Sequence, residues 1–194
     1  RKNASPLTSC CAPSAAQRSL KTLIFADVTG FSGLDEASAP GFFSTFLGAV
    51  QGVVESLATR PQQTNTWGDG LYFVFEAAAD AADCALRLVD AIAAVSWAEF
   101  GMPATTQVRI GMHTGPAYSM WDPLLGKQNY FGAHVTRAAR IEPVALPGQV
   151  YVSEACAATL AATAADRFLC RYVGRLALAK RYGASPIYRV ERAG

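Results

Sequence analysis

Charged residues are scarce in this chain, and neither sign dominates. Asp, Glu, Lys and Arg make up 16% of the 194 residues, and the net charge is +2. A net charge this small does not indicate a nucleic-acid-binding protein, and we expect no nucleic-acid partner. Hydrophobic residues make up 51% of the sequence, which is typical of a globular chain with a sizeable core.

Long hydrophobic segments are also missing. No apolar run reaches the roughly 18 residues that a membrane-spanning helix needs, and no signal segment opens the sequence. We therefore expect no membrane partner. The five cysteines follow no metal-ligand spacing. An odd number of unpatterned cysteines favours a reducing compartment, so we expect a cytoplasmic protein.

Hydrophobic periodicity divides the chain into a leader and one domain. Residues 1–19 lack periodicity and are expected to be a flexible N-terminal leader, followed by one folded domain over 20–194. Apolar spacing predicts the core elements in the order β-α-β-β-α-β, and an α-β-α-β-β tail follows. This order predicts an α/β (α+β) fold with a ferredoxin-like βαββαβ core and C-terminal additions. The expected core ranges are 20–28, 39–59, 63–67, 71–75, 76–96 and 107–113.

The tail contains one segment that regular periodicity does not explain. Residues 115–129 are interrupted by Gly and Pro and are expected to form an extended hairpin or arm. A helix over 133–141, a strand over 149–152 and a helix capped by Ser153 should follow. The end of the chain, 168–190, suggests one more hairpin.

Two acidic residues occupy turn positions beside predicted buried strands. Asp27 ends the apolar strand of LIFADVTGFSGL, and Asp69 lies in the glycine-bearing turn of NTWGDGLYF. The first strand and the hairpin pair side by side in a ferredoxin-like sheet, so both carboxylates could hold one or two divalent cations. Asp-Gly is also an ordinary hairpin dipeptide, and the spacing by itself leaves that alternative open. The turn over 29–33 offers backbone N–H groups for phosphate oxygens, although no Walker lysine follows it.

Four segments occur in an order that resembles a known family. They are LIFADVTGFSGL, NTWGDGLYFVFE, VRIGMHTGPAY and YFGAHVTRAARIEPVALPGQVYVSEA. From about residue 21 to 190, the chain resembles the catalytic domain of the class III nucleotidyl cyclases, the adenylate and guanylate cyclase family. The resemblance implies the ferredoxin-like core and an intramolecular reaction. In that reaction the ribose 3′-oxygen of a nucleoside triphosphate attacks the α-phosphate, which yields a 3′,5′-cyclic nucleotide and pyrophosphate.

The resemblance also implies a metal and phosphate site. Asp27 and Asp69 match the family's two metal aspartates, and Val28 is expected at the same site. The implied cofactors are two divalent cations, Mg²⁺ or Mn²⁺. The residues expected to bind the substrate's phosphates here are Gly30, Phe31 and Ser32.

Other implied groups belong to the helix over 133–141 and to the C-terminal hairpin. Arg140 matches the arginine that stabilises charge on the α-phosphate, and Thr136 stands where the family usually has an Asn that contacts the ribose region. Lys180 falls at the family's triphosphate lysine, although Arg181 replaces the glycine that often follows. The family's sites lie at a head-to-tail dimer interface, so the resemblance implies a homodimer with shared active sites.

The two positions that read the base in this family are unusual here. The first is Lys in typical adenylate cyclases and Glu in typical guanylate cyclases, and the second is Asp or a small residue. This chain has Asn65 and Asn129. An uncharged amide offers one acceptor and two donors, so two amides could satisfy uracil, or cytosine or adenine after rotation. Guanine is the third choice, because neither position offers a carboxylate.

These positions favour a pyrimidine triphosphate narrowly, and ATP is the alternative. Compact members without a fused sensor domain resemble the pyrimidine cyclases of bacterial anti-phage defence, whose cyclic UMP or CMP activates a separate effector. We therefore expect a downstream receptor that is not physically bound. The bulky residues Phe42, Phe43, Phe46 and Trp67 could narrow the base pocket, although such residues more often pack in a core.

Two other functions remain possible from the sequence. A silent relative would bind nucleotide or regulate a partner through the same interface, and a ferredoxin-like RNA-binding domain would need exposed sheet aromatics and a basic face. The presence of Asp27, Asp69 and Arg140 together favours the enzyme.

Overall fold

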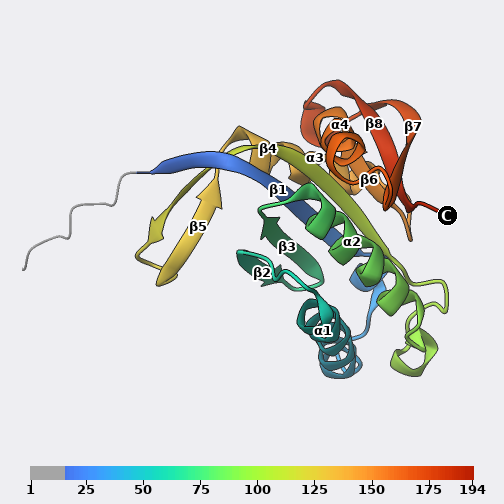
Figure 1. Ribbon diagram of the computed structural model, residues 1–194. Helices are drawn as coiled ribbons and strands as arrows, with labels where there is room; N and C mark the ends of the chain where they lie inside the picture. The colour runs from blue at the N-terminus through green and yellow to red at the C-terminus, as the bar shows by residue number, and fades with distance from the viewer. Residues whose placement is uncertain (1–15) are drawn as a thin grey trace, which may run out of the picture.

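Eight strands form a single sheet in residues 16–194, the part of the chain that this computed structural model describes (Figure 1). The strand order is β2-β3-β1-β4-β6-β8-β7, and β5 pairs with β4 beyond this path. The first four strands in this order are those of a ferredoxin-like βαββαβ core, so the predicted fold class is confirmed. The strands are β1 (Gln17–Val28), β2 (Gln63–Trp67), β3 (Gly70–Phe75), β4 (Val108–Asp122), β5 (Lys127–Phe131), β6 (Val150–Ser153), β7 (Phe168–Ala177) and β8 (Ala184–Arg192).

Helices cover the two faces of the sheet unequally. One face packs against α1, α2 and α4, and the opposite face carries α3 over β1 and β4. On the α3 side, Tyr72 and Val74 of β3 are buried, whereas the edge strand β2 is largely exposed beyond Gln63. The helices are α1 (Ala39–Ser56), α2 (Ala78–Ala93), α3 (Ala133–Ile141) and α4 (Glu154–Thr163), with short 3-10 turns η1 (Phe31–Gly33), η2 (Trp97–Phe100), η3 (Glu142–Val144) and η4 (Ala179–Arg181).

Strand β1 is apolar throughout its middle because both of its faces are covered. Ile24 packs with the α1 and α2 side chains, whereas Leu23 packs with Tyr72 and Ala138 on the α3 side. Successive strand residues point to opposite faces, so burial of both faces requires a continuous apolar run. This explains why the strand reads as a hydrophobic block up to its terminal aspartate.

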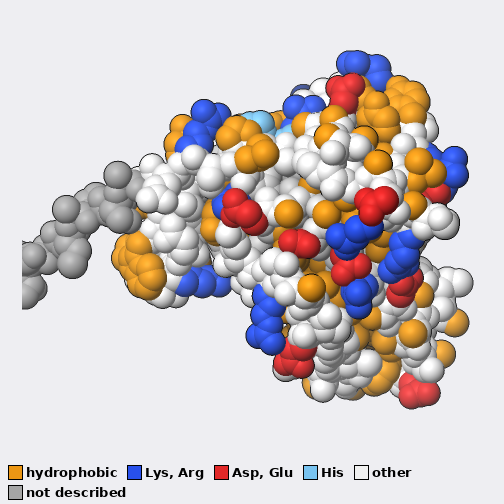
Figure 2. All heavy atoms as spheres, in the orientation of Figure 1, with side chains coloured by type: hydrophobic (Ala, Val, Ile, Leu, Met, Phe, Trp, Pro, Cys, Tyr) orange, Lys and Arg blue, Asp and Glu red, His pale blue; other side chains and the backbone are white. Residues whose placement is uncertain are grey.

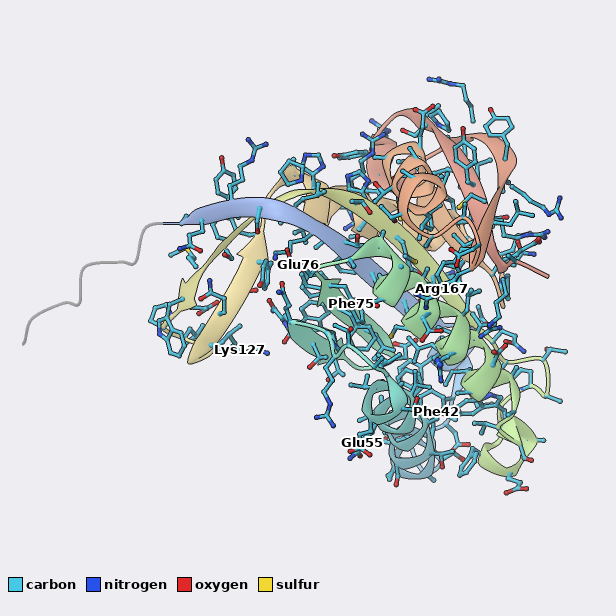
Figure 3. All side chains as sticks on the ribbon, in the orientation of Figure 1. Phe42, Glu55, Phe75, Glu76, Lys127 and Arg167 are labelled. Atoms are coloured by element: carbon cyan, nitrogen blue, oxygen red, sulfur yellow. The ribbon has the colours of Figure 1, made fainter. Side chains whose placement is uncertain are left out.

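The phenylalanines of α1 belong to the core. Phe42 and Phe46 are fully buried and stack at 5.6 Å between ring centroids, and Figure 3 shows Phe42 between α1 and the rest of the fold. Burying each ring contributes roughly 1.5–3 kcal/mol. The idea that these two residues narrow a base pocket is therefore wrong. Trp67, by contrast, is 60% exposed at the end of β2.

The N-terminal boundary of the domain differs from the expected one. Residues 17–19 were expected in the leader but lie in β1, where they pair with residues 117–119 of β4. The remainder of the expected leader, apart from residue 16, lies outside the described residues. Strand β4 is longer than expected because its second half continues through Gly115 and Pro116 to pair with the start of β1. The expected arm is the outer part of the β4–β5 hairpin.

The outer end of this hairpin is apolar on its surface. Figure 2 shows hydrophobic atoms gathered there, while Lys and Arg alternate with Asp and Glu over the rest of the visible face. The exposed hydrophobic side chains of the hairpin are Tyr118, Trp121, Leu124, Leu125 and Phe131. Within residues 16–194, no helix has the length and apolar character needed to cross a membrane.

Candidate active site

The two predicted metal aspartates lie at neighbouring positions of the sheet. Asp27 stands at the end of β1, opposite Arg109 of β4, and Asp69 lies in the turn between β2 and β3. Strand β3 pairs directly with β1, which places the turn beside the end of β1. The structure thus brings together two carboxylates that lie 42 positions apart in the sequence.

The environment of Asp69, including the nearby Asp27 carboxylate, raises its pKa. Burial, together with the negative charge of Asp27 and a side-chain hydrogen bond to it, raises the pKa of Asp69 from 3.8 to about 6. Arg109 opposes this increase in pKa, but only as a minor influence. Two carboxylates held this close without a cation repel each other when both are ionised. A divalent cation between them would remove that repulsion.

Arg109 is a site residue that the sequence reasoning missed. Its guanidinium donates to Asp27 Oδ2 at 2.6 Å and to Glu142 Oε1 at 2.5 Å. Arg109 therefore anchors Asp27 while its charge stays close to the carboxylate pair. The register of β1 against β4 places Arg109 opposite Asp27, and only a correct strand pairing could have revealed this neighbour.

The oxygen atoms at this edge fit a hard divalent cation. Carboxylate oxygens and backbone carbonyls are the protein ligands that Mg²⁺ and Mn²⁺ prefer, and Mg²⁺ commonly takes one or two carboxylates plus phosphate oxygens. Asp27 and Asp69 supply two carboxylates, and the buried Val28 follows Asp27 directly. Residues 16–194 contain no group of three or more His, Cys, Asp or Glu placed to hold a metal, so phosphates, water or backbone carbonyls would complete the shell. The metal role of these residues remains a prediction.

The predicted phosphate loop forms a tight turn after β1. Gly30 has φ +86°, a left-handed conformation that glycine adopts without strain, and it begins the 3-10 turn η1. The Phe31 ring packs against Phe42 and Phe43 at centroid distances of 5.2 and 5.3 Å. The side chain of Phe31 therefore holds the turn on the core. Phosphate binding by the backbone of Gly30, Phe31 and Ser32 stays a prediction.

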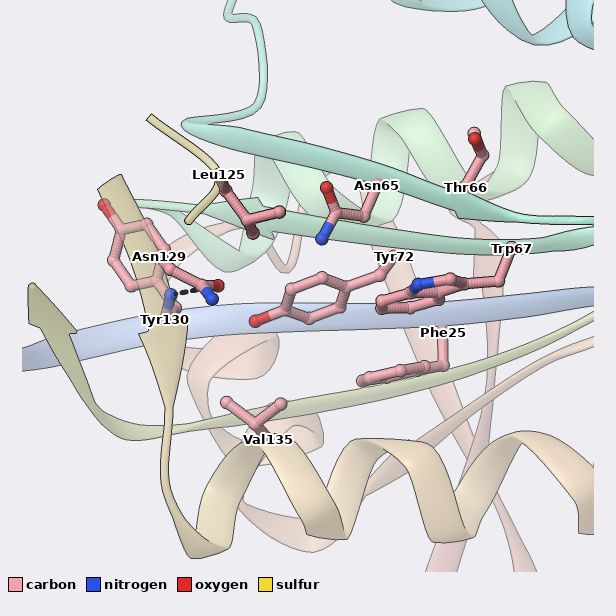
Figure 4. A pocket seen from close by; sticks show the side chains of 9 residues that line it. All are labelled: Phe25, Asn65, Thr66, Trp67, Tyr72, Leu125, Asn129, Tyr130 and Val135. Atoms are coloured by element: carbon pink, nitrogen blue, oxygen red, sulfur yellow. Dashed lines mark hydrogen bonds between the residues drawn. The ribbon is translucent and has the colours of Figure 1, made fainter. Parts of the chain in front are cut away.

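Both predicted base readers line one pocket of about 470 Å³ (Figure 4). Its lining comes from three adjacent strands, because Asn65 and Phe25 both pair with Tyr72 across the sheet. Asn129 reaches the pocket from β5. The full set of lining residues is Phe25, Asn65, Thr66, Trp67, Tyr72, Leu125, Asn129, Tyr130 and Val135.

The other predicted groups gather around α3. Thr136 is exposed and Arg140 is half-buried on this helix. Lys180 is exposed in η4, and the adjacent Tyr182 hydroxyl donates to the carbonyl of Ala133 at 3.4 Å. Among the ion pairs of residues 16–194, none involves Arg140 or Lys180. These side chains make no such contact with Asp27 or Asp69 of the same chain.

The backbone at Lys180 and Arg181 has a conformation that favours glycine. Lys180 and Arg181 have φ of 55° and 57°, and they are the two non-glycine residues of 16–194 with positive φ. A glycine would adopt this conformation without strain, which accounts for the glycine that the family often has after the lysine.

A family comparison identifies the class of protein that this fold and site define. The model of the adenylate and guanylate cyclase catalytic domain matches residues 15–188. The chain therefore belongs to this family, the class III nucleotidyl cyclases. The match covers the carboxylate pair, the base pocket, α3 and the hairpin that carries Lys180.

Individual relatives are distant and larger. A putative adenylate cyclase of Rhizobium meliloti is 29% identical over 145 residues, and a pH-sensitive adenylate cyclase of Mycobacterium tuberculosis is 28% identical over 173 residues. The matches cover 74% and 88% of this chain but only 24% and 40% of those proteins. Among solved structures, a guanylate cyclase domain from Catenaria anguillulae in complex with GTP superposes with a TM-score of 0.77 at 18% identity, covering 92% of this chain and 100% of that one.

Proposed function

We propose that the chain is the catalytic domain of an active nucleotidyl cyclase that works as a homodimer with two divalent cations per site. The observation that carries the proposal is the convergence of Asp27 and Asp69 at one sheet edge, in a family member that also retains Arg140. A silent relative would have little reason to keep two mutually repelling carboxylates together.

Each site would draw on two copies of the chain. One copy supplies Asp27, Asp69 and the turn at Gly30, and the other supplies Arg140 and Lys180. The second copy would sit against the exposed edge strand β2 and the turn that carries Asp69, so that its α3 faces the carboxylates. The lack of an ion-pair partner for Arg140 within residues 16–194 supports this arrangement.

The residues have separable roles in the reaction. Asp27 and Asp69 would hold divalent cations, which lower the pKa of the ribose 3′-hydroxyl and neutralise the phosphates. Backbone N–H groups of the Gly30 turn and the Lys180 ammonium bind the triphosphate chain. Arg140 donates to the non-bridging oxygens of the α-phosphate as negative charge accumulates there, and Thr136 contacts the ribose region. Arg109 keeps Asp27 oriented toward the nucleotide.

The proposed substrate is a pyrimidine triphosphate, with ATP as the second candidate. Two uncharged amides, Asn65 and Asn129, line the base pocket where guanine would need a carboxylate. The resulting cyclic pyrimidine would act as a cytoplasmic second messenger, and a role in anti-phage signalling belongs to this proposal. Adenylate cyclase activity is supported by the names of the curated relatives.

One assay tests the activity and the base together. The purified protein is incubated with UTP, CTP, ATP or GTP and with Mn²⁺ or Mg²⁺, and cyclic products are separated and quantified. We expect a 3′,5′-cyclic pyrimidine nucleotide and pyrophosphate in equal amounts, dependent on the cation. Cyclic AMP as the main product would show that the substrate is ATP and not a pyrimidine triphosphate. If none of the four triphosphates gives a cyclic product, the chain is a nucleotide-binding module and not an enzyme.

A further inference from the structure

Tyr72 carries a buried hydroxyl that has no hydrogen-bond partner in residues 16–194. Only 2% of this residue is exposed, and its hydroxyl oxygen is one of the few buried polar atoms there without a partner. Native structures seldom leave a buried hydroxyl unsatisfied unless water, a ligand or another chain completes it. Figure 4 shows the Tyr72 side chain lying along the pocket, with its hydroxyl directed toward the Asn129 side.

The amide of Asn65 has a fixed orientation because of Lys127. The Lys127 ammonium, which extends from β5 toward β2 (Figure 3), lies 2.6 Å from Asn65 Oδ1. An ammonium group can only donate, so the carbonyl oxygen of Asn65 must face Lys127. The amide nitrogen then points into the pocket, toward Tyr72 (Figure 4). Asn65 therefore presents hydrogen-bond donors to a bound base.

The amide of Asn129 is fixed in the same way by three different neighbours. Its Oδ1 accepts from the backbone N–H of Tyr130 at 2.9 Å and from Gln63 at 3.0 Å, and its Nδ2 donates to Asp122 Oδ2 at 3.0 Å. A backbone N–H cannot accept and a carboxylate cannot donate, so a rotated amide would lose the contacts with Tyr130 and Asp122. The one group that Asn129 has left for a ligand is its second N–H donor.

The amide donors of Asn65 and Asn129, together with the Tyr72 hydroxyl, match the pairing edge of uracil better than that of the other bases. Uracil offers two carbonyl oxygens that flank a ring N–H, whereas the pairing edges of cytosine, adenine and guanine all carry an amino group that would face an amide donor. A hydroxyl can accept as well as donate, and burial raises the pKa of Tyr72, so its proton stays in place at neutral pH.

We propose that the Tyr72 hydroxyl reads the base by accepting a hydrogen bond from the ring N–H of uracil, while the Asn65 and Asn129 amides donate to the two carbonyl oxygens. Lys127 is a positioning residue that holds Asn65 in its donor orientation. This inference rests on the proposed cyclase function and narrows its pyrimidine substrate to UTP. Trp67, which stacks on Tyr72 at 6.2 Å between ring centroids, closes one side of the pocket.

The test compares Tyr72→Phe and Lys127→Met with wild type and with the control Tyr172→Phe. Tyr172 lies on β7, is 61% exposed and does not line the pocket. For each protein, kcat/KM is measured with UTP, CTP, ATP and GTP in Mn²⁺. Binding of 3′-deoxyUTP and 3′-deoxyATP, which cannot be cyclised, is measured by calorimetry.

Tyr72→Phe should lower kcat/KM for UTP about tenfold, the effect of one lost hydrogen bond, and lower it less than threefold for ATP and GTP. Lys127→Met should reduce the preference for UTP over GTP, since the Asn65 amide can then rotate. Tyr172→Phe should match wild type. Because Tyr72→Phe removes only an unsatisfied hydroxyl, its melting temperature should not fall.

Two results would overturn the assignment. One is a UTP-to-ATP ratio for Tyr72→Phe within twofold of wild type, and the other is a wild type that prefers ATP. Either leaves the cyclase function intact. If wild type forms no cyclic product from any triphosphate, the proposed function fails. The ratio of the 3′-deoxyUTP and 3′-deoxyATP dissociation constants in Tyr72→Phe and wild type then decides the base-reading role by itself.

Discussion

Replacing Asp69 with asparagine is expected to abolish cyclase activity while making the metal-free protein more stable. An amide cannot replace a carboxylate as a ligand of a hard cation, so kcat should fall by about three orders of magnitude or more. The same change removes a partly buried charge and its repulsion with Asp27, which together raise the pKa of Asp69 to about 6 in the folded chain. Activity and stability should therefore move in opposite directions.

The gain in stability should depend on pH in a defined way. Since the pKa of Asp69 is about 6 in the fold and 3.8 ordinarily, metal-free wild type should lose stability as the pH rises through this interval. Asp69→Asn has no such loss. Its advantage should be about 1 kcal/mol at pH 7, after allowance for solvent screening, and should vanish below about pH 4.

Urea unfolding in EDTA at pH 4 and pH 7 measures this difference, and Asp166→Asn is the matched control because Asp166 is exposed in the turn before β7. The control should change neither stability nor turnover. Adding Mn²⁺ should raise the melting temperature of wild type but not that of Asp69→Asn. An Asp69→Asn protein that turns over at the wild-type rate, or that is less stable at pH 7, would remove Asp69 from the proposed metal site.

Replacing Arg140 with alanine should lower kcat by a similar factor, but without affecting cation binding. If the guanidinium stabilises charge that builds up on the α-phosphate, kcat should fall about 1,000-fold while the nucleotide still binds. Cation binding should also persist, because Arg140 makes no ion pair with Asp27 or Asp69 within residues 16–194.

Single-turnover rates measure the chemical step, and the dissociation constant of a 3′-deoxynucleoside triphosphate measures nucleotide binding. Together they separate a loss of catalysis from a loss of binding. Arg171→Ala is a control of the same chemistry, since Arg171 is exposed and pairs with Glu191 on the far hairpin. A loss confined to nucleotide binding, with kcat preserved, would contradict a role for Arg140 at the α-phosphate.

The regular elements were predictable wherever local signals agree with the packing. Helix α3 occupies 133–141 as expected, and Ser153 caps α4 by accepting a hydrogen bond from the backbone N–H of Cys156. The length of β4 was not predictable, because Gly115 and Pro116 are typical of a loop. They remain in the strand because the first residues of β1 lie opposite them, and those residues were assigned to the leader.

The site was predictable in its residue types but not in its contacts. Asp27 and Asp69 could be picked out because Asp27 ends an apolar strand and Asp69 lies in the turn of a predicted hairpin. Arg109 and Tyr72 lie on segments that read as ordinary strands, and Lys127 lies on the expected arm. Their importance depends on strand register and on the hairpin that carries Lys127 to Asn65. The orientation of an amide follows from its neighbours, and a sequence does not specify those neighbours.

The most direct test of the shared site is a mixed dimer. Asp69→Asn and Arg140→Ala chains, each with a different affinity tag, are co-expressed, and the dimer that carries both tags is purified by two successive affinity steps. One of its two sites keeps both Asp69 and Arg140, so the account predicts about half of the wild-type activity, although each parent is nearly inactive. A mixed dimer no more active than its parents would contradict a site built from two copies of this chain.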